Sequence, residues 1–578
     1  MQRTIRSFIY GCTIFGALGP LPSLGTEALS TNNTPNPVDI RRQESLIDKL
    51  NNRYKSRVAN CGSGISAMDC SGIILRRAKL EDGVEFWKLK KAATDLGSVT
   101  FSWLRADGNN YGDKLFSGFI YMDKDTAAKT AEYNLKKLEP HCIYPFMAET
   151  QGNPDNPDNL PGPRELAGCA PAKTQVKKQN GKSYCKTVKA TTLNSWMAYF
   201  ENTGKSKLEK QCSLSAMSPG QLLTSLEVRK KYDNEAKKHA NELLMPLWTE
   251  NQAKQLPIEA FFFNTVRSGS FDHTLKLRDA FYNKTGRMVP LVGLNISGNN
   301  ESIFKPLTRD QQGRATANAL NLRYAKTDMN CDGRVSLYCN GVLVRTMKFE
   351  TTARAWNPTQ NSRNIGAVAF SYLRADQGIR KLAWEHRQGL IFSELDALKQ
   401  PRMYPIMARC MYPSDAGSDV RGSNGCGAHR SYPNVSKECS AIIIVEKQNY
   451  IDHYRTVPDI KAGDAYFTRR NQHQCSLAIN PKEFNIALST REQLLTRLQR
   501  SHHNELIVAP WPQDIPDLLP LEAFFYQDTA DNKALTHAKE MQKDLHARAN
   551  KLWKPVIRLN LNAPSGGAFA TYRAQDQN

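Results

Sequence analysis

The chain has 578 residues, of which 78 are Lys or Arg and 56 are Asp or Glu, so its formal net charge at pH 7 is +22. Such a charge suits nucleic acid, an acidic polysaccharide or an anionic membrane surface. Basic residues are spread along the chain, with no unbroken run longer than 229–231, and no nucleic-acid-binding motif is present. We therefore expect no nucleic-acid partner.

The first 25 residues predict a secretory signal peptide. Arg3 and Arg6 precede an apolar stretch at 8–18, and small residues follow it. This stretch is too short to span a bilayer, and no later segment approaches the required length, so we expect no membrane span. The chain should be secreted, either to the medium or to a periplasm, and residues 26–38 should form a flexible leader.

Hydrophobic patterning then predicts a helix followed by short strands. Apolar side chains recur at helical spacing between residues 40 and 54. Short apolar or aromatic runs bounded by Gly, Pro or charge predict strands at 73–75, 99–104, 119–121 and 258–263. Residues 151–163 predict a Pro-rich insertion loop, and 184–240 a mainly helical region. A linker is expected near 297–312, with a last strand at 303–304 that matches one near Phe569. The fold class is therefore α+β.

Two long stretches of the chain resemble each other in order. The matching segments are 50–54 with 320–324, 70–76 with 339–345, 101–107 with 370–376, 144–148 with 404–408, 241–243 with 504–506, and 256–262 with 519–525. Offsets are 339 − 70 = 269 near the start and 519 − 256 = 263 near the end, far longer than a solenoid repeat. We interpret the chain as a tandem duplication, with one domain at 39–306 and a second at 307–578, each large enough to bury its own core.

Twelve cysteines follow the signal peptide, six in each repeat. An even number in an exported chain favours three disulfides per repeat, and the cysteines lack the short paired spacing of zinc ligands. Neighbours are expected to pair, although the sequence alone allows other connectivities. The expected pairs are Cys61–Cys70, Cys142–Cys169, Cys185–Cys212, Cys331–Cys339, Cys410–Cys426 and Cys439–Cys475. One detail is inconsistent, because Cys142 precedes its Tyr-Pro dipeptide whereas Cys410 follows the matched one.

Three polar positions occur in both repeats within otherwise apolar strands. They are an arginine (Arg76, Arg345), a serine (Ser102, Ser371) and a glutamate directly before a strand (Glu242, Glu505). A charge at the end of an apolar strand is costly unless it is solvated, paired or used. Two interpretations stay open: the groups line a cleft, or the arginine and the glutamate form an ion pair that braces two strands.

Other repeated residues also allow two interpretations. The Arg-x-Asp motifs at 105–107 and 374–376 suit a turn or a surface pair better than a site. Glu259 and Glu522 could face solvent or supply a second acid to a cleft. Four repeated tryptophans could stack on a ring-shaped ligand, although core packing is the commoner outcome: Trp87, Trp248, Trp356 and Trp511. His429, His502 and His503 have no counterparts in the first repeat, so a shared histidine mechanism is not expected.

Several of these strings closely resemble the halovibrin family of secreted bacterial proteins. The strings lie at 339–345, 356–358, 367–376, 425–429, 504–506, 519–526 and 556–559. They cover the second repeat almost fully and the first more loosely. Halovibrin-type proteins are usually single units, so this chain looks like a fused double version.

The resemblance implies consumption of NAD as substrate, with no bound cofactor and no metal. The enzyme would be an ADP-ribosyltransferase, or a glycohydrolase that passes the same group to water. ADP-ribosyltransferases use an arginine on one strand, a serine on another and a glutamate before a later strand. Arg345, Ser371 and Glu505 occur in that order. The usual Glu or Gln two residues before the glutamate is replaced by His503 or Ala240, which favours plain hydrolysis.

Roles follow from the resemblance. The glutamates would stabilise the positive charge that develops on the ribose, the serines would orient them, and the arginines would grip a phosphate. Tyr372 or Trp356 would stack on nicotinamide. We expect a monomer whose partners are NAD and, where transfer occurs, an acceptor protein of a host or competitor. The alternative is a non-enzymatic secreted binding protein, such as an adhesin or toxin component, with a basic ligand-binding surface.

Overall fold

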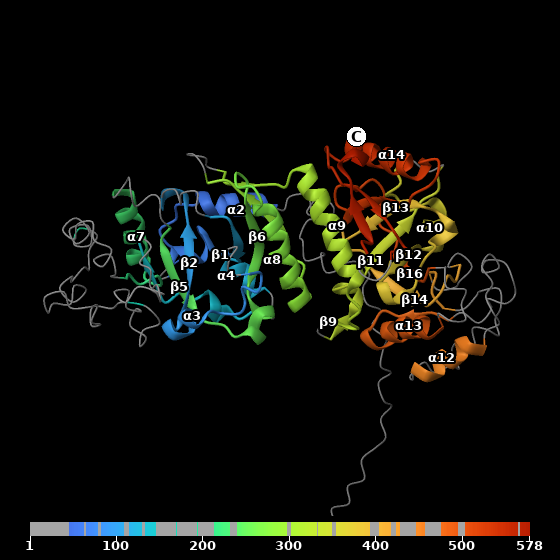
Figure 1. Cartoon of the computed structure of the whole chain (residues 1–578), viewed down its shortest axis with the longest axis horizontal. Coiled ribbons are helices and arrows are strands. Elements are labelled where there is room, and N and C mark those ends of the chain that lie inside the picture. The colour runs from blue at the N-terminus through green and yellow to red at the C-terminus, as the bar shows by residue number, and fades with distance from the viewer. Residues whose placement is uncertain are drawn as a thin grey trace, which may run out of the picture.

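The computed structural model describes residues 45–62, 65–78, 83–108, 115–129, 133–145, 169, 194, 213–231, 240–296, 302–331, 333–349, 354–393, 404–417, 424–427, 447–456, 475–494, 503–563 and 567–577. The predicted signal peptide, leader and 151–163 loop lie outside these residues. Figure 1 shows two lobes side by side, the first half of the chain in blue to green and the second in yellow-green to red, each with strands at its centre and helices around them.

The first lobe contains an eight-stranded sheet. Its strands are β1 (Ile73–Ala78), β2 (Ser98–Leu104), β3 (Ser117–Tyr121), β4 (Cys142–Tyr144), β5 (Glu242–Pro246), β6 (Ile258–Asn264), β7 (Leu291–Leu294) and β8 (Phe304–Lys305). Its helices are α2 (Leu46–Lys55), α3 (Lys91–Leu96), α4 (Lys124–Ala128), α7 (Pro219–Lys231) and α8 (Ser270–Thr285). The strand order across the sheet is β4-β5-β2-β1-β3-β6-β7-β8.

The second lobe contains a nine-stranded sheet. Its strands are β11 (Val342–Thr346), β12 (Val368–Leu373), β13 (Gln388–Phe392), β14 (Ala408–Tyr412), β15 (Leu477–Ala478), β16 (Glu505–Val508), β17 (Leu521–Tyr526), β18 (Val556–Leu559) and β19 (Ala570–Tyr572). Its helices are α9 (Arg309–Ala325), α10 (Gln360–Ile365), α12 (Lys447–Thr456), α13 (Pro481–Leu494) and α14 (Lys533–Arg548), and β9 (Asn330–Cys331) pairs with β10 (Arg334–Val335). The sheet order is β15-β14-β16-β12-β11-β13-β17-β18-β19.

The two sheets have the same strand order once β15 is set aside. In each sheet one pair is parallel, β6 with β7 and β17 with β18, and the other described pairs are antiparallel. A parallel pair needs a crossover connection, which α8 and α14 supply at equivalent places. Both faces of each sheet are covered by apolar clusters, so the sheets lie at the centres of the two lobes.

The patterns that predicted strands correspond to strands. All four predicted runs of the first half fall within β1, β2, β3 and β6, and every residue of β6 is buried because this strand is central and covered on both faces. The predicted last strand is β8, which begins at Phe304. Within 184–240 the described helix is α7, whose Leu222, Leu226 and Val228 are buried.

Four of the expected disulfides fall among the described residues, and all four are formed. They are Cys61–Cys70, Cys142–Cys169, Cys331–Cys339 and Cys410–Cys426, with Cα–Cα distances between 5.7 and 6.0 Å. Cys475 is also disulfide-bonded, whereas Cys185, Cys212 and Cys439 lie outside the described residues. In the part of the chain that the structure describes, no helix is long and apolar enough to cross a bilayer.

One predicted correspondence is wrong. Tyr144 lies opposite Glu242 on the neighbouring strand, and Tyr412 lies opposite Glu505 at the same place in the second sheet. The dipeptide that begins at Tyr144 therefore corresponds to the one that begins at Tyr412, not to residues 404–405. With this match the cysteines on β4 and β14 also correspond, at an offset of 410 − 142 = 268, and the earlier inconsistency disappears.

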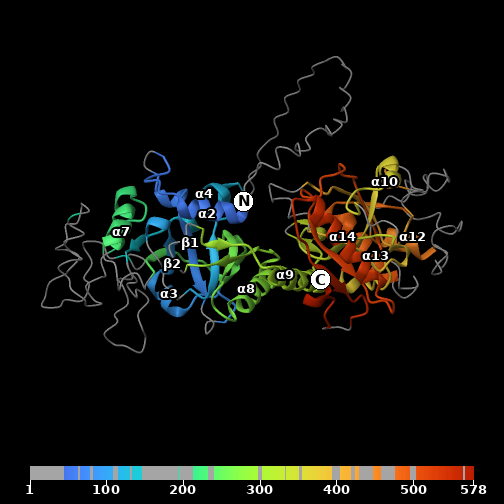
Figure 2. The same ribbon diagram turned by 90° about the horizontal axis from the view of Figure 1, so that it is seen from above.

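Helices α8 and α9 form the junction between the lobes, where both views place them (Figures 1 and 2). Arg278 of α8 is buried there, and it donates to the Ala315 carbonyl at 3.1 Å and to the Asn318 side chain. Asn318 in turn donates to Asp279 at 2.8 Å, and Tyr282 donates to a carbonyl of the second lobe at 2.6 Å. These hydrogen bonds connect α8 to α9 and to the second lobe.

Candidate functional site

The serine and the glutamate of each predicted set lie next to each other. In the second sheet Phe370 of β12 pairs with Leu506 of β16, and continuing this antiparallel register by one residue places Ser371 beside Glu505. In the first sheet Phe101 pairs with Leu243, which places Ser102 beside Glu242 by the same argument. Directly opposite residues on neighbouring strands have Cβ atoms about 5 Å apart. A hydroxyl and a carboxylate therefore lie together in both lobes.

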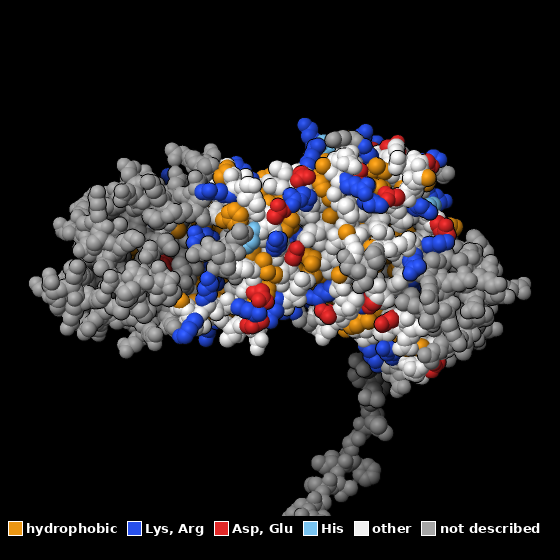
Figure 3. Space-filling view, in the orientation of Figure 1, with side chains coloured by type: hydrophobic (Ala, Val, Ile, Leu, Met, Phe, Trp, Pro, Cys, Tyr) orange, Lys and Arg blue, Asp and Glu red, His pale blue; other side chains and the backbone are white. Residues whose placement is uncertain are grey.

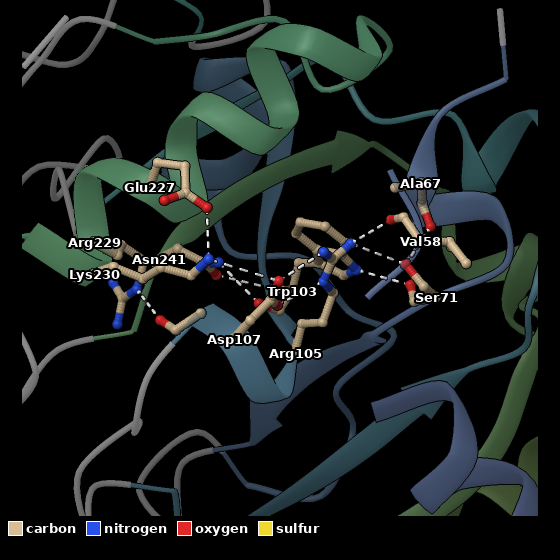
Figure 4. Close-up of polar contacts among 11 residues, drawn as sticks. Val58, Ala67, Ser71, Trp103, Arg105, Asp107, Glu227, Arg229, Lys230 and Asn241 are labelled. Atoms are coloured by element: carbon tan, nitrogen blue, oxygen red, sulfur yellow. Dashed lines mark hydrogen bonds and ion pairs between the residues drawn. The ribbon is translucent and has the colours of Figure 1, made fainter. Parts of the chain in front are cut away.

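An asparagine directly before each glutamate fixes this arrangement. The amide of Asn504 accepts from the Tyr372 backbone N–H and donates to the Tyr372 carbonyl, both at 2.8 Å. Asn241 does the same with Trp103, at 2.9 and 2.8 Å. At the end of the backbone pairing between the two strands, each asparagine side chain thus makes the two hydrogen bonds that a neighbouring strand would otherwise make. Figure 4 shows Asn241 against Trp103 in the first lobe, with Arg105 and Asp107 beside them.

The arginines lie on the other face of the sheet. Ser371 is opposite Val344, and Ser102 is opposite Leu75, so each serine shares a face with the residue before the arginine. Successive strand residues point to opposite faces. Arg345 and Arg76 therefore point away from the serine and glutamate of their own lobes. The structure does not bring the predicted three groups together, and it equally rules out an Arg–Glu brace between these strands.

Each arginine packs on a tryptophan instead. The guanidinium of Arg345 lies 5.5 Å from the ring centre of Trp511, and that of Arg76 lies 5.2 Å from the ring centre of Trp248. Arg345 is 5 % exposed and donates to the Asn357 carbonyl at 3.1 Å. Burial lowers the pKa of Arg345 to about 10, because removal from water disfavours the charged form. Cation–π contact explains how the core tolerates this charge.

The glutamates are buried, with exposed fractions of 2 % for Glu242 and 3 % for Glu505. Glu242 accepts a hydrogen bond from the Thr100 hydroxyl at 3.3 Å. Glu505 accepts one from the backbone N–H of Ala416 at 2.9 Å. Each carboxylate therefore has a defined donor, and that of Glu505 is covered by the segment that holds Ala416.

A histidine and a second acid accompany Glu505. The Nε2 atom of His503 lies 3.3 Å from Oδ2 of Asp415, and both side chains are at least nine-tenths buried. Burial works against the charged form of His503, but Asp415 and Glu505 outweigh it and raise its pKa. In the first lobe the residue two positions before Glu242 is Ala240, so this cluster belongs to the second lobe.

The rings proposed to stack on nicotinamide lie in the core. Tyr372 is fully buried, and its hydroxyl donates to the side-chain oxygen of Asn340 at 2.6 Å. Trp356 is 1 % exposed and its carbonyl accepts from the indole N–H of Trp511 at 2.9 Å. Trp87 and Trp248 repeat this bond in the first lobe, at 3.1 Å. The four tryptophans therefore pack in the protein core, which was the alternative to stacking on a ring-shaped ligand.

The repeated charges outside the predicted set form ion pairs. Arg105 and Arg374 each pair with the aspartate two residues later, as expected for a turn, although both guanidinium groups are buried. Glu259 accepts from Arg53 of α2 at 2.7 Å, and Glu522 pairs with Arg323 of α9. These two glutamates therefore bind a helix to a strand. They neither face solvent nor form a second acid of a site.

Sequence reasoning missed two positioning residues besides the asparagines. Arg229 on α7 donates to the carbonyls of Gly108 and Pro145, at 2.9 and 2.6 Å. Arg491 on α13 donates to those of Gln377 and Pro413, at 2.8 and 2.9 Å. Their offset, 491 − 229 = 262, is close to that of the flanking repeats, and it was the signal available in the sequence. Each arginine ties a helix to the chain that continues from the strand carrying Tyr144 or Tyr412.

A small hollow of about 10 Å³ lies at the start of β11, with Arg323, Asn340, Gly341 and Tyr372 in its lining. It has room for about one water molecule. Among the described residues, no three His, Cys, Asp or Glu side chains gather in a way that could hold a metal ion. The described site is thus built from a carboxylate, a hydroxyl and the backbone that holds them. Comparison with family models, curated proteins and solved structures gives no match to this chain.

Proposed function

We propose that the chain is a secreted, tandemly duplicated enzyme that cleaves the bond between nicotinamide and ribose in NAD, acting as a glycohydrolase or an ADP-ribosyltransferase. The observation that carries the proposal is the serine beside a glutamate at the same place in both sheets, Ser102 with Glu242 and Ser371 with Glu505. The resemblance of the second repeat to halovibrin supplies the substrate. The matching strand orders support the duplication.

The chemistry suits a fixed carboxylate. Departure of nicotinamide leaves positive charge on the ribose, and a carboxylate held in a site of low dielectric stabilises that charge where it forms. Ser371 would orient the ribose or the carboxylate of Glu505. Water would then attack the ribose carbon and lose a proton, giving ADP-ribose and nicotinamide. A protein side chain in place of water would give transfer.

The phosphate-binding role is the part of the proposal that the arrangement favours least. Arg345 and Arg76 point to the tryptophan face and not to the carboxylate face. We therefore place recognition of NAD on the serine and glutamate, and assign the arginines to packing in the conformation described. For Arg345 to bind the diphosphate, the end of β11 would have to rotate so that this side chain moved to the face that carries Glu505.

The test is release of nicotinamide from NAD by the purified mature protein, compared with Glu505→Gln, Glu242→Gln and the double variant. The double variant should lose activity by at least about a hundredfold, since one electrostatic stabiliser of a transition state is worth about 10² to 10³ in rate. Glu540→Gln is the matched control, because Glu540 is exposed on α14. Full activity in the double variant would remove the catalytic assignment.

A non-enzymatic binding protein is the second candidate. The opposite facing of arginine and glutamate, together with the burial of both glutamates, favours it. Figure 3 shows basic side chains scattered over both lobes with acidic ones between them, which does not point to one ligand surface on that face. Absence of NAD turnover, combined with salt-sensitive binding to an acidic glycan, would select this candidate.

A further inference from the structure

Residues 413–417 lie across the carboxylate of Glu505. The backbone N–H of Ala416 donates to Oε2 of Glu505 at 2.9 Å, and Ala416 is itself 3 % exposed. Glu505 is 3 % exposed, so a ribose cannot reach its carboxylate while the segment lies across it. The segment must therefore move away before Glu505 can act on a substrate.

The segment is held by an ion pair to the strand that carries Glu505. Oδ2 of Asp415 lies 3.3 Å from Nε2 of His503, and Oδ1 of Asp415 accepts from the Gly417 N–H at 3.2 Å. On its other side, Nδ1 of His503 lies 2.5 Å from the Asn504 carbonyl. A neutral imidazole donates from one nitrogen alone, so it would present a lone pair either to the carbonyl or to the carboxylate. Nε2 makes no hydrogen bond, so its contact with Asp415 is an ion pair, which exists only while the ring is protonated.

The ends of the segment are fixed, which confines any movement to the segment itself. Cys410 and Cys426 are joined by a disulfide that encloses it, and the Tyr412 hydroxyl lies 2.9 Å from the carbonyls of Gly425 and Gly427. Gly417 has a positive φ of 58°, a conformation that glycine adopts without strain. Within the described residues 413–417, Asp415 and Ala416 contact the strand that carries Glu505, and the Pro413 carbonyl accepts from Arg491 of α13 at 2.9 Å.

We propose that His503 and Asp415 form a latch that holds residues 413–417 over Glu505, so that loss of the proton from His503 opens the second lobe to NAD. That the latch controls access of NAD to Glu505 rests on the proposed function. The charged groups that face His503 are Asp415 and Glu505. Both carboxylates raise the pKa of His503 in the folded protein. The ion pair therefore stabilises the closed segment fully at low pH, and this stabilisation is lost as pH rises through that pKa. The first lobe has Ala240 at this position and lacks the histidine.

Two measurements on the full chain test the latch. Hydrogen exchange of the peptide 411–417, corrected for the intrinsic effect of pH, should show protection that falls about tenfold between about pH 5 and pH 8. Asp415→Asn keeps the acceptor for Gly417 but removes the charge, so its protection should be low at both pH values. His503→Ala, which copies the first lobe, is the second variant. Glu385→Gln is the control, since it breaks an exposed ion pair with Lys381.

The second measurement is nicotinamide release by the Glu242→Gln protein, in which only the second lobe can act. Its rate should rise with pH as protection falls, and Asp415→Asn should flatten that dependence. Unchanged protection in Asp415→Asn would overturn the latch and leave the proposed function standing. Protection that responds as expected, without nicotinamide release from any version, would overturn the proposed function and with it the control of activity.

Discussion

The side chain of Asn504 provides the sharpest test of how the site is built. Its amide makes two hydrogen bonds of 2.8 Å to the backbone of Tyr372, a residue with no exposed surface. Asn504→Ala leaves one buried N–H and one buried carbonyl without partners, and each such group costs about 1–3 kcal/mol. We expect the free energy of unfolding to fall by about 2–6 kcal/mol, a large share of the ~5–15 kcal/mol that stabilises a typical domain.

Urea unfolding followed by far-UV circular dichroism measures this loss. Asn364→Ala is the matched control, because Asn364 is exposed on α10 and its removal should change stability by less than about 0.5 kcal/mol. Asn241→Ala should cost as much in the first lobe as Asn504→Ala does in the second, and the two should add because the sites are far apart. A loss below about 1 kcal/mol for Asn504→Ala would refute the assignment of this side chain as a strand partner.

Two further predictions concern the first lobe and the junction. Burial opposes ionisation of Asp123, but Arg53, Lys49 and the Thr126 N–H outweigh it and hold its pKa at about 2, against an ordinary 3.8. A depressed carboxyl pKa stabilises the fold above about pH 4, and the contribution is lost as pH falls toward 2. Asp123→Asn should thus cost about 2 kcal/mol at pH 7 and almost nothing near pH 2 in acid unfolding; an equal cost at both pH values would contradict this. Arg278→Ala should cost about 2–4 kcal/mol and split thermal unfolding into two calorimetric transitions, because it removes the buried donor between α8 and α9; a single unchanged transition would show that the lobes do not depend on it.

Much of the fold could be predicted from sequence because the strands are short apolar runs with clear ends. The run 258–263 is an example: apart from Glu259 it is apolar, and all of its residues are buried, as expected for a central strand covered on both faces. Neighbour pairing of cysteines was also predictable for the four disulfides described, although other connectivities were open. These features depend on local composition and on short separations along the chain.

The site was predicted less well because it depends on register. A shift of one residue moves a side chain to the other face of a sheet. The amino-acid sequence around Arg345 does not show that Val344, and not Arg345, lies opposite Ser371. The same limit hid the role of Asn504, which is visible only when the end of the β12–β16 ladder is known.

The false match of Tyr-Pro dipeptides has a similar origin. The second half contains three of them, at 404–405, 412–413 and 432–433. The residues after Tyr404 resemble those after Tyr144, and this resemblance favours the first dipeptide in the sequence. Pairing across the sheet selects the second, since Tyr412 lies opposite Glu505. A match of local residues alone can therefore place a dipeptide on the wrong strand at the edge of the site.

The most direct test of the central claim is the amount of nicotinamide released from NAD by the wild-type chain and by the Glu242→Gln, Glu505→Gln double variant, measured by proton NMR under the same conditions. We expect steady release by the wild type and a loss of at least about a hundredfold in the double variant. Equal release by both proteins, or none by the wild type at any pH between about 5 and 8, would contradict it.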